Sequence, residues 1–308
     1  MNVSMVIDTD TASDDAVALI MAIRSAHVSL RAVTTVAGNV PLKFATRNAL
    51  ITLETAGATD VPVFAGLGGP RLRTLETAQE VHGEDGMGDI GLADPIGQAR
   101  PEHAVDALRR IAREEPGQHM LVTLGPLSTI AAALLIEPDL LTKFTQVVSM
   151  GGAFDGIGNC NAVGEFNIWV DPEAAQIFCN APGDKTFVGW EIARHYSVMT
   201  LADQAELAAV GPLGQFAVDI NVAAERFDRD QNGLGGYALP DPIAIAVAIN
   251  PAIATRMSRH TLTIGVGTND RGSTLKSSAV DGLSCTVVDA VDEALYRALL
   301  LDCCRQLV

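Results

Sequence analysis

Basic residues are scarce in this chain of 308 residues. Its 21 Lys and Arg stand against 37 Asp and Glu, which gives a formal net charge of −16 at pH 7. Binding to nucleic acid or to anionic lipid requires clustered Lys and Arg, so the charge balance argues against both as general partners. The same excess of acidic residues is compatible with a cationic ligand, including a metal ion.

Long apolar runs and a cysteine framework are also missing. The longest apolar runs, at 16–23 and 130–136, are far shorter than the roughly 20 residues that span a bilayer. The N-terminus has no basic region of the signal-peptide type and reaches Asp8 before an apolar run could form. The five cysteines are an odd number without C-x-x-C spacing, so we expect no disulfide framework and a cytoplasmic location.

What the sequence does contain is a regular alternation of short β-branched runs with helical patterns. At 48% hydrophobic residues, the chain is too apolar to be disordered. The apolar strands predict an α/β fold with a mainly parallel, doubly wound central sheet, helices on both faces and an active site at the strand C-terminal ends. The expected strands lie at 4–8, 30–36, 62–65, 120–124, 147–150 and 186–188, and the expected helices at 14–25, 41–56, 103–115, 127–136 and 172–179. A mostly helical stretch at 200–250 then precedes two or three strands and a closing helix.

Four aspartates fall within eight residues near the N-terminus: Asp8, Asp10, Asp14 and Asp15. Because side chains alternate along a strand, Asp8 and Asp10 point to the same side, and Asp14 and Asp15 then open the next helix. Carboxylates this close repel one another unless some are protonated or a cation lies among them. Oxygen ligands alone indicate a hard ion, Ca²⁺ or Mg²⁺. Helix capping is the alternative, although it uses only one or two carboxylates.

Two further polar segments stand out against apolar surroundings. Asp241 lies between two prolines just before an apolar helix, which suits either a functional carboxylate or a plain N-terminal cap. The polar segment 159–167 lies between an apolar strand and the helix expected at 172. Its Asn and Glu side chains suit the recognition of hydroxyl groups, and equally a loop with hydrogen bonds between side chains and backbone.

Together these segments resemble the nucleoside hydrolase family of the inosine–uridine-preferring type. The run DTDTASDD at 8–15 is similar to its hallmark motif, and EFN at 165–167 followed by DPEAA at 171–175 is similar to a second specific block. Further similarities are TTVAGN at 34–39, HGEDGMG at 82–88, LGPL at 124–127, MGG at 150–152 and DP at 241–242. These motifs follow the family order from about residue 3 to 250, so the resemblance implies a single nucleoside hydrolase-like domain over 1–308.

The resemblance implies calcium-dependent hydrolysis of the N-glycosidic bond of ribonucleosides, in a homo-oligomer of two or four subunits. It implies a Ca²⁺ ion held by Asp10, Asp15, Asp241 and the backbone carbonyl of Leu124. Asp10 would be the general base toward a metal-activated water, and His82 would have a catalytic role. The substrate contacts that it implies are Asp14, Asn39, His82, Met150, Asn159, Glu165, Phe166, Asn167 and Asp241.

One position departs from the family. Its best-known members carry His or Trp just before the late Asp, where the side chain helps the base to leave. Here that position is Pro240, which can neither protonate nor stack. His82 remains as a group that titrates in the useful range. Weaker candidates for the base pocket are Trp190, Arg226, Phe227 and Tyr237.

Two other functions stay open from the sequence. The segment VIDTDT at 6–11 also resembles the DxDxT start of haloacid dehalogenase-like phosphatases, in which Asp8 would be a nucleophile assisted by Mg²⁺. Against this, Asp14 and Asp15 have no place in that motif. Pro240 also motivates a non-catalytic nucleoside-binding protein, although all the acids that would activate water are present.

Overall fold

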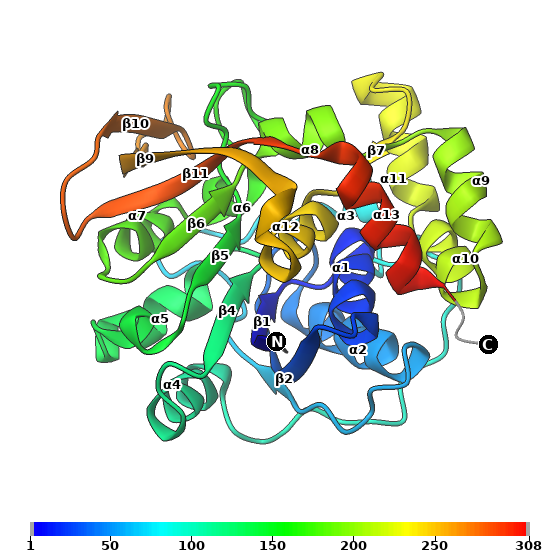
Figure 1. Cartoon of the computed structure of the whole chain (residues 1–308), viewed down its shortest axis with the longest axis horizontal. Coiled ribbons are helices and arrows are strands. Elements are labelled where there is room, and N and C mark those ends of the chain that lie inside the picture. Colours follow the sequence, from blue (N-terminus) through cyan, green and yellow to red (C-terminus); the bar gives the residue numbers. More distant parts are fainter. Residues whose placement is uncertain (1–2, 306–308) are drawn as a thin grey trace.

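The computed structural model describes residues 3–305, and a nine-stranded sheet crosses it (Figure 1). Its strands are β1 (Val3–Thr9), β2 (Val28–Thr35), β3 (Val63–Ala65), β4 (His119–Thr123), β5 (Val147–Met150), β6 (Lys185–Val188), β9 (Ala254–Ile264), β10 (Thr274–Ser278) and β11 (Ser284–Val291). They lie in the order β10-β9-β11-β6-β5-β4-β1-β2-β3. The pairs from β3 across to β11 are parallel, whereas β9 pairs antiparallel with β11 and β10.

Helices cover both faces of this sheet, because its inner strands are apolar on both sides. In β1, Met5 and Ile7 belong to one hydrophobic core and Val6 to the other. The first core takes in α1 (Ser13–Arg24), α2 (Leu42–Thr55), α8 (Trp190–Tyr196), α9 (Leu201–Ala209), α10 (Pro212–Asp219), α11 (Val222–Phe227), α12 (Pro240–Ile249) and α13 (Glu293–Cys304). The second takes in α4 (Ala104–Glu114), α5 (Ser128–Ile136) and α7 (Pro172–Asn180).

Short elements complete the chain. They are α3 (Gln79–His82), α6 (Phe166–Val170), a two-stranded pair of β7 (Val198–Met199) and β8 (Tyr237–Ala238), two 3₁₀ turns (Leu140–Lys143 and Pro251–Ile253) and a π turn (Asp228–Asn232). Glycines allow the strand ends to approach one another. A Cβ on Gly38 would lie 2.1 Å from a carboxylate oxygen of Asp10, and one on Gly125 would lie 2.5 Å from the other.

The predicted fold class is confirmed, with each expected strand and helix present to within two residues at its ends. The antiparallel edge formed by β9 and β10 adds to the mainly parallel sheet. Among the described residues, no helix is both long and apolar enough to cross a membrane. All five cysteines are free thiols, and Cys303 and Cys304 are buried in α13.

Candidate active site

Asp10 directly follows β1 at the carboxyl edge of the sheet. Its Oδ2 accepts a hydrogen bond from the backbone N–H of Asn39, at 2.6 Å, from the segment that follows β2. Its Oδ1 has no hydrogen-bond partner among residues 3–305 although the atom is buried. The neighbouring strand ends therefore hold this carboxylate in place and leave one oxygen available.

Asp15 is fixed in the first turn of α1. Its Oδ1 accepts the hydroxyl of Thr9 at 2.6 Å, and its Oδ2 accepts the backbone N–H of Ala12 at 2.9 Å. The side-chain amide of Asn39 reaches the same Oδ2 at 3.4 Å. The capping interpretation of this acid is thus correct in part, since Asp15 binds the N-terminal backbone of its own helix.

A third acid, Asp241, comes from a distant part of the sequence and lies beside α1. Asp241 lies in the first turn of α12, and oxygens of Asp14, Asp15 and Asp241 lie within 4.8 Å of one another. The Oδ1 atoms of Asp14 and Asp241 are buried without a hydrogen-bond partner in the described part of the chain. Side chains more than 200 positions apart therefore form one cluster of carboxylates.

Burial sets the electrostatics of this cluster. Loss of water raises the pKa of Asp14 to about 6 and that of Asp15 to about 7, and the charge of Asp14 adds to the rise for Asp15. The pKa values of Asp10 and Asp241 are raised well above their ordinary range, first by burial and then by the charge of Asp15. The cluster therefore disfavours its own ionisation unless a positive charge joins it.

Asp8 lies on the same strand but is bound differently. Its Oδ1 accepts the hydroxyl of Thr34 on β2 at 2.5 Å, and burial raises the pKa of the carboxyl to about 7. Asp8 does not line the cavity described below. Asp8 was expected on the same side of the strand as Asp10. It nevertheless does not form part of the cavity wall.

The opposite wall is built by the short helix α6. Glu165 caps this helix: its Oε1 accepts the N–H of Asn167 at 2.9 Å, and its Oε2 accepts the N–H of Gly152 at 2.9 Å. The side-chain amide of Asn167 donates to the carbonyl of Leu124 at 2.6 Å and approaches Sδ of Met150 at 3.2 Å. One helix turn thus joins the ends of β4 and β5 to the polar wall.

Asn159 and Phe166 lie at the outer part of this wall. The Oδ1 of Asn159 accepts the backbone N–H of Phe166 at 2.9 Å. The loop interpretation of the 159–167 segment is therefore correct for this contact. Both residues nevertheless line the cavity, so a structural contact and a binding role are compatible.

His82 ends α3, and Gly83 follows it with φ of +89°. The ring is buried, which lowers the pKa of His82 to about 4. Its Nδ1 lies 2.9 Å from the hydroxyl oxygen of Ser13 and 3.7 Å from Oδ1 of Asp14. At neutral pH the uncharged ring therefore faces the acidic cluster.

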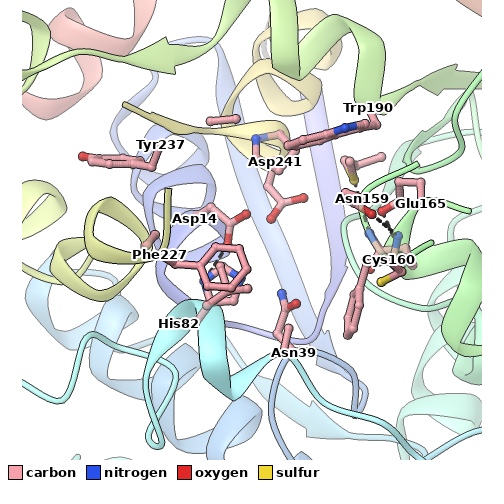
Figure 2. Close-up of a pocket in the computed structure, with 18 of the residues that line it drawn as sticks. Asp14, Asn39, His82, Asn159, Cys160, Glu165, Trp190, Phe227, Tyr237 and Asp241 are labelled. Carbon is pink, nitrogen blue, oxygen red and sulfur yellow. Dashed lines mark hydrogen bonds and ion pairs between the residues drawn. The ribbon is translucent and has the colours of Figure 1, made fainter. Parts of the chain in front are cut away.

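These walls enclose a cavity of about 410 Å³ (Figure 2). Figure 2 shows Asp14, Asp241 and Asn39 around its centre, His82 and Phe227 on one side, and Asn159 and Glu165 on the other. The expected site residues that line it are Asp14, Asn39, His82, Leu124, Met150, Asn159, Glu165, Phe166, Asn167 and Asp241. Asp10 and Asp15 are fully buried and are absent from this lining.

The base-pocket candidates divide between cavity and surface, and several cavity residues were not predicted from the sequence. Trp190, Phe227 and Tyr237 line the cavity together with Pro240, whereas Arg226 is exposed and lies outside the lining. The missed lining residues include Glu76, Cys160, Trp169, Asn221 and Asp228. Residues 221, 224 and 228 follow the spacing of one helix face. This spacing would have placed Asn221 and Asp228 on the same face.

The comparisons with known proteins agree with this geometry. The sequence model described as inosine-uridine preferring nucleoside hydrolase matches residues 5–298. The chain is 37% identical to the probable uridine nucleosidase 2 of Arabidopsis thaliana over 82% of this chain and 79% of that one. It is 34% identical to the inosine-uridine preferring nucleoside hydrolase of Crithidia fasciculata over 82% of this chain and 80% of that one.

Solved structures give the same result. A plant nucleoside hydrolase superposes with a TM-score of 0.94 at 29% identity, and each chain is covered completely. The purine-preferring ribonucleoside hydrolase from Gardnerella vaginalis superposes with a TM-score of 0.91 at 27% identity over 98% of each chain. The phosphatase alternative loses its support, since the hydrolase match takes in the DTDTASDD run itself. The chain belongs to the inosine-uridine preferring nucleoside hydrolase family of N-glycosyl hydrolases.

Proposed function

We propose that the protein catalyses the calcium-dependent hydrolysis of the N-glycosidic bond of ribonucleosides, giving free base and ribose. The observation that carries this proposal is the buried cluster of Asp10, Asp14, Asp15 and Asp241 at one cavity that also has a polar wall. Cleavage of a glycosidic bond passes through an oxocarbenium-like state. A cavity rich in carboxylates stabilises the positive charge that then develops on the sugar.

The residues of the cluster fit a hard divalent cation. Buried carboxylate oxygens of Asp10, Asp14 and Asp241 have no hydrogen-bond partner among the described residues, and every donor is oxygen, as Ca²⁺ prefers. We assign the ion to Asp10, Asp15, Asp241 and the carbonyl of Leu124. When bound, Ca²⁺ would lower the pKa of a water molecule and so supply a nucleophile at neutral pH.

Asp10 is the general base of this proposal. Its Oδ2 is occupied by the N–H of Asn39, whereas its Oδ1 is free of hydrogen bonds in the described chain. The free oxygen can take a proton from the attacking water. Because the Asn39 contact fixes the carboxylate, Asp10 keeps one orientation during this transfer.

The sugar is held by groups on both walls. Asp14 and Asn39 lie on the side of the aspartate cluster, and Asn159, Glu165 and Asn167 lie on the other. The amide nitrogen of Asn167 is bound to Leu124, which leaves its Oδ1 to accept a ribose hydroxyl. Met150 and Phe166 provide apolar contact beside these polar groups.

The base lies against a different part of the cavity. His82 and Phe227 line the side of the cavity opposite Asn159 and Glu165, and Pro240 offers no proton there. The ring of His82 is one of the groups there that can form a hydrogen bond to a departing base. We assign the leaving-group contact to His82.

We further propose that the protein works as a single nucleoside hydrolase-like unit over 1–308, in a cytoplasmic homo-oligomer of two or four subunits. Light scattering coupled to size-exclusion chromatography measures the subunit number.

The experiment is an assay with p-nitrophenyl riboside and a panel of natural ribonucleosides, with calcium or with a chelator. The aryl riboside needs no help for its leaving group, so it reports bond cleavage by the aspartate cluster alone. We expect p-nitrophenol and reducing sugar with calcium, and loss of both with chelator that calcium reverses. Calcium-loaded protein that binds nucleosides without releasing p-nitrophenol would establish the non-catalytic alternative instead.

A further inference from the structure

Ser13 contacts His82 and has no role in the reaction as proposed above. It is the first residue of α1, it is completely buried, and its hydroxyl oxygen lies 2.9 Å from Nδ1 of His82. This is the sole hydrogen bond of the Ser13 hydroxyl to residues 3–305. The nearest carboxylate oxygen, Oδ1 of Asp14, is 3.7 Å from the same ring nitrogen and is beyond hydrogen-bond range.

The other ring nitrogen of His82 is in a different situation. Nε2 forms no hydrogen bond to the described residues, and the atom is not fully buried. His82 itself lines the cavity. A half-turn of the ring about its Cβ–Cγ axis would exchange Nδ1 with a carbon and move Nε2 away from its position. The Ser13 contact favours one of these two orientations, because only a ring nitrogen can bond the hydroxyl.

The partner of Nδ1 also affects which nitrogen carries the proton. A neutral imidazole has one N–H and one bare nitrogen. A serine hydroxyl can donate to Nδ1 or accept from it, and where it donates, the ring proton resides on Nε2. A carboxylate at this position could only accept, which would place the ring proton on Nδ1 and leave the cavity-facing nitrogen without a donor.

We propose that Ser13 is a positioning residue that holds His82 with an Nε2–H directed at the departing base. This inference rests on the proposed function. As the bond from C1′ to the base breaks, the electron pair moves to the base, and Nε2–H donates a hydrogen bond to a ring nitrogen or carbonyl oxygen of the base. His82 keeps its proton and the base takes one from water, so the ring needs no reprotonation. His82, held by Ser13, thus supplies the hydrogen bond to the leaving base that Pro240 cannot supply.

The first test compares two leaving groups in calcium-loaded Ser13→Ala and Ser13→Thr variants. For Ser13→Ala we expect kcat with natural ribonucleosides to fall about tenfold, the effect of one neutral hydrogen bond, with KM little changed. With p-nitrophenyl riboside the same variant should stay within about twofold of wild type. Ser13→Thr keeps the hydroxyl and should recover most of the loss.

A matched control separates positioning from damage to the fold. Ser128 is also buried at the first position of a helix, α5, and its hydroxyl donates to Asp171 at 2.6 Å outside the cavity. Ser128→Ala should affect both substrates alike. If Ser13→Ala does the same, or leaves both substrates unchanged, the positioning role is wrong. If wild type fails on the aryl riboside, the proposed function itself is wrong.

A second test does not use activity. The ¹⁵N chemical shifts of a histidine-labelled protein report which ring nitrogen carries the proton, and His82→Gln identifies the signal among six histidines. We expect the Nε2–H form of His82 in the wild type and a shift toward the Nδ1–H form in Ser13→Ala. A wild-type ring with its proton on Nδ1, or no change in Ser13→Ala, would overturn the inference.

Discussion

Asp241→Asn is the most informative change in the aspartate cluster. The substitution preserves the shape of the side chain and removes an ionisable carboxyl beside Asp14 and Asp15. In the structure Oδ1 of Asp241 is buried and unpartnered among residues 3–305, and the three side chains bring oxygens within 4.8 Å of one another. We therefore expect the variant to stabilise the metal-free protein and to weaken calcium binding.

The size of the effect follows from distance and pKa. Two unit charges 4.8 Å apart repel by about 3–4 kcal/mol at an effective dielectric constant of about 20. The pKa of Asp15, raised from 3.8 to about 7, corresponds to about 4 kcal/mol against the ionised folded state at pH 8. Between about pH 4 and 7 the folded state binds more protons than the unfolded state, so the metal-free protein loses stability as pH rises.

Thermal unfolding with chelator at pH 5 and pH 8 measures this loss. Of this, about 2.7 kcal/mol is lost between pH 5 and pH 8, which for 308 residues corresponds to about 4 °C in Tm, so wild type should unfold about 4 °C lower at pH 8. At pH 8 Asp241→Asn should unfold several degrees above wild type in chelator. Calcium should raise the Tm of wild type strongly and that of the variant weakly, so that their order reverses.

The control is Asp302→Asn, which removes an exposed carboxylate at the far end of the chain that makes no hydrogen bond or ion pair to residues 3–305. It should unfold like wild type in every condition. The reasoning is refuted if chelated wild type unfolds at the same temperature at pH 5 and pH 8. It is also refuted if Asp241→Asn is less stable than wild type in chelator at pH 8, because the cluster would then not be repulsive.

Two further predictions concern the reaction. Asp10→Ala should lower kcat by about 10³ while the calcium-loaded protein keeps its circular dichroism spectrum, because a general base contributes 10²–10⁴ in rate; wild-type rates would show that another group takes the proton. Replacing uridine by 2′-deoxyuridine should lower kcat/KM by about 10⁴, because buried groups such as Asp14 and Asn167 would lose their hydroxyl partner. A steady-state comparison of the two nucleosides measures this, and similar values would contradict the proposed ribose contacts.

Local patterns in the sequence were sufficient to predict the parallel part of the sheet. Continuous runs such as 5–7 and 120–122 are buried on both faces, so their residues are apolar whichever strand lies beside them. The antiparallel edge could not be derived in the same way. The pairing of β9 with β11 joins residues about 20 to 40 positions apart through backbone contacts that the side-chain pattern does not record.

The residues of the site also fall into two groups, those that local patterns predict and those that they do not. Asp10, Asp14 and Asp15 are close in sequence and follow β1, so strand geometry alone predicts that they meet. Ser13 and His82 are 69 positions apart and meet only when α3 packs near the start of α1. The polar residues Asn221 and Asp228 were missed because nothing in their local pattern shows that α11 faces a cavity.

The sequence by itself determined the α/β class, the family and the carboxylates and amides at the strand ends, because short-range periodicity and motif spacing record them directly. Only the tertiary structure decided that Asp241 joins Asp14 and Asp15, that these acids lose their water and resist ionisation, and that Ser13 bonds one nitrogen of His82. Burial and through-space distance cause these effects. Both depend on how distant segments pack, which no local pattern specifies.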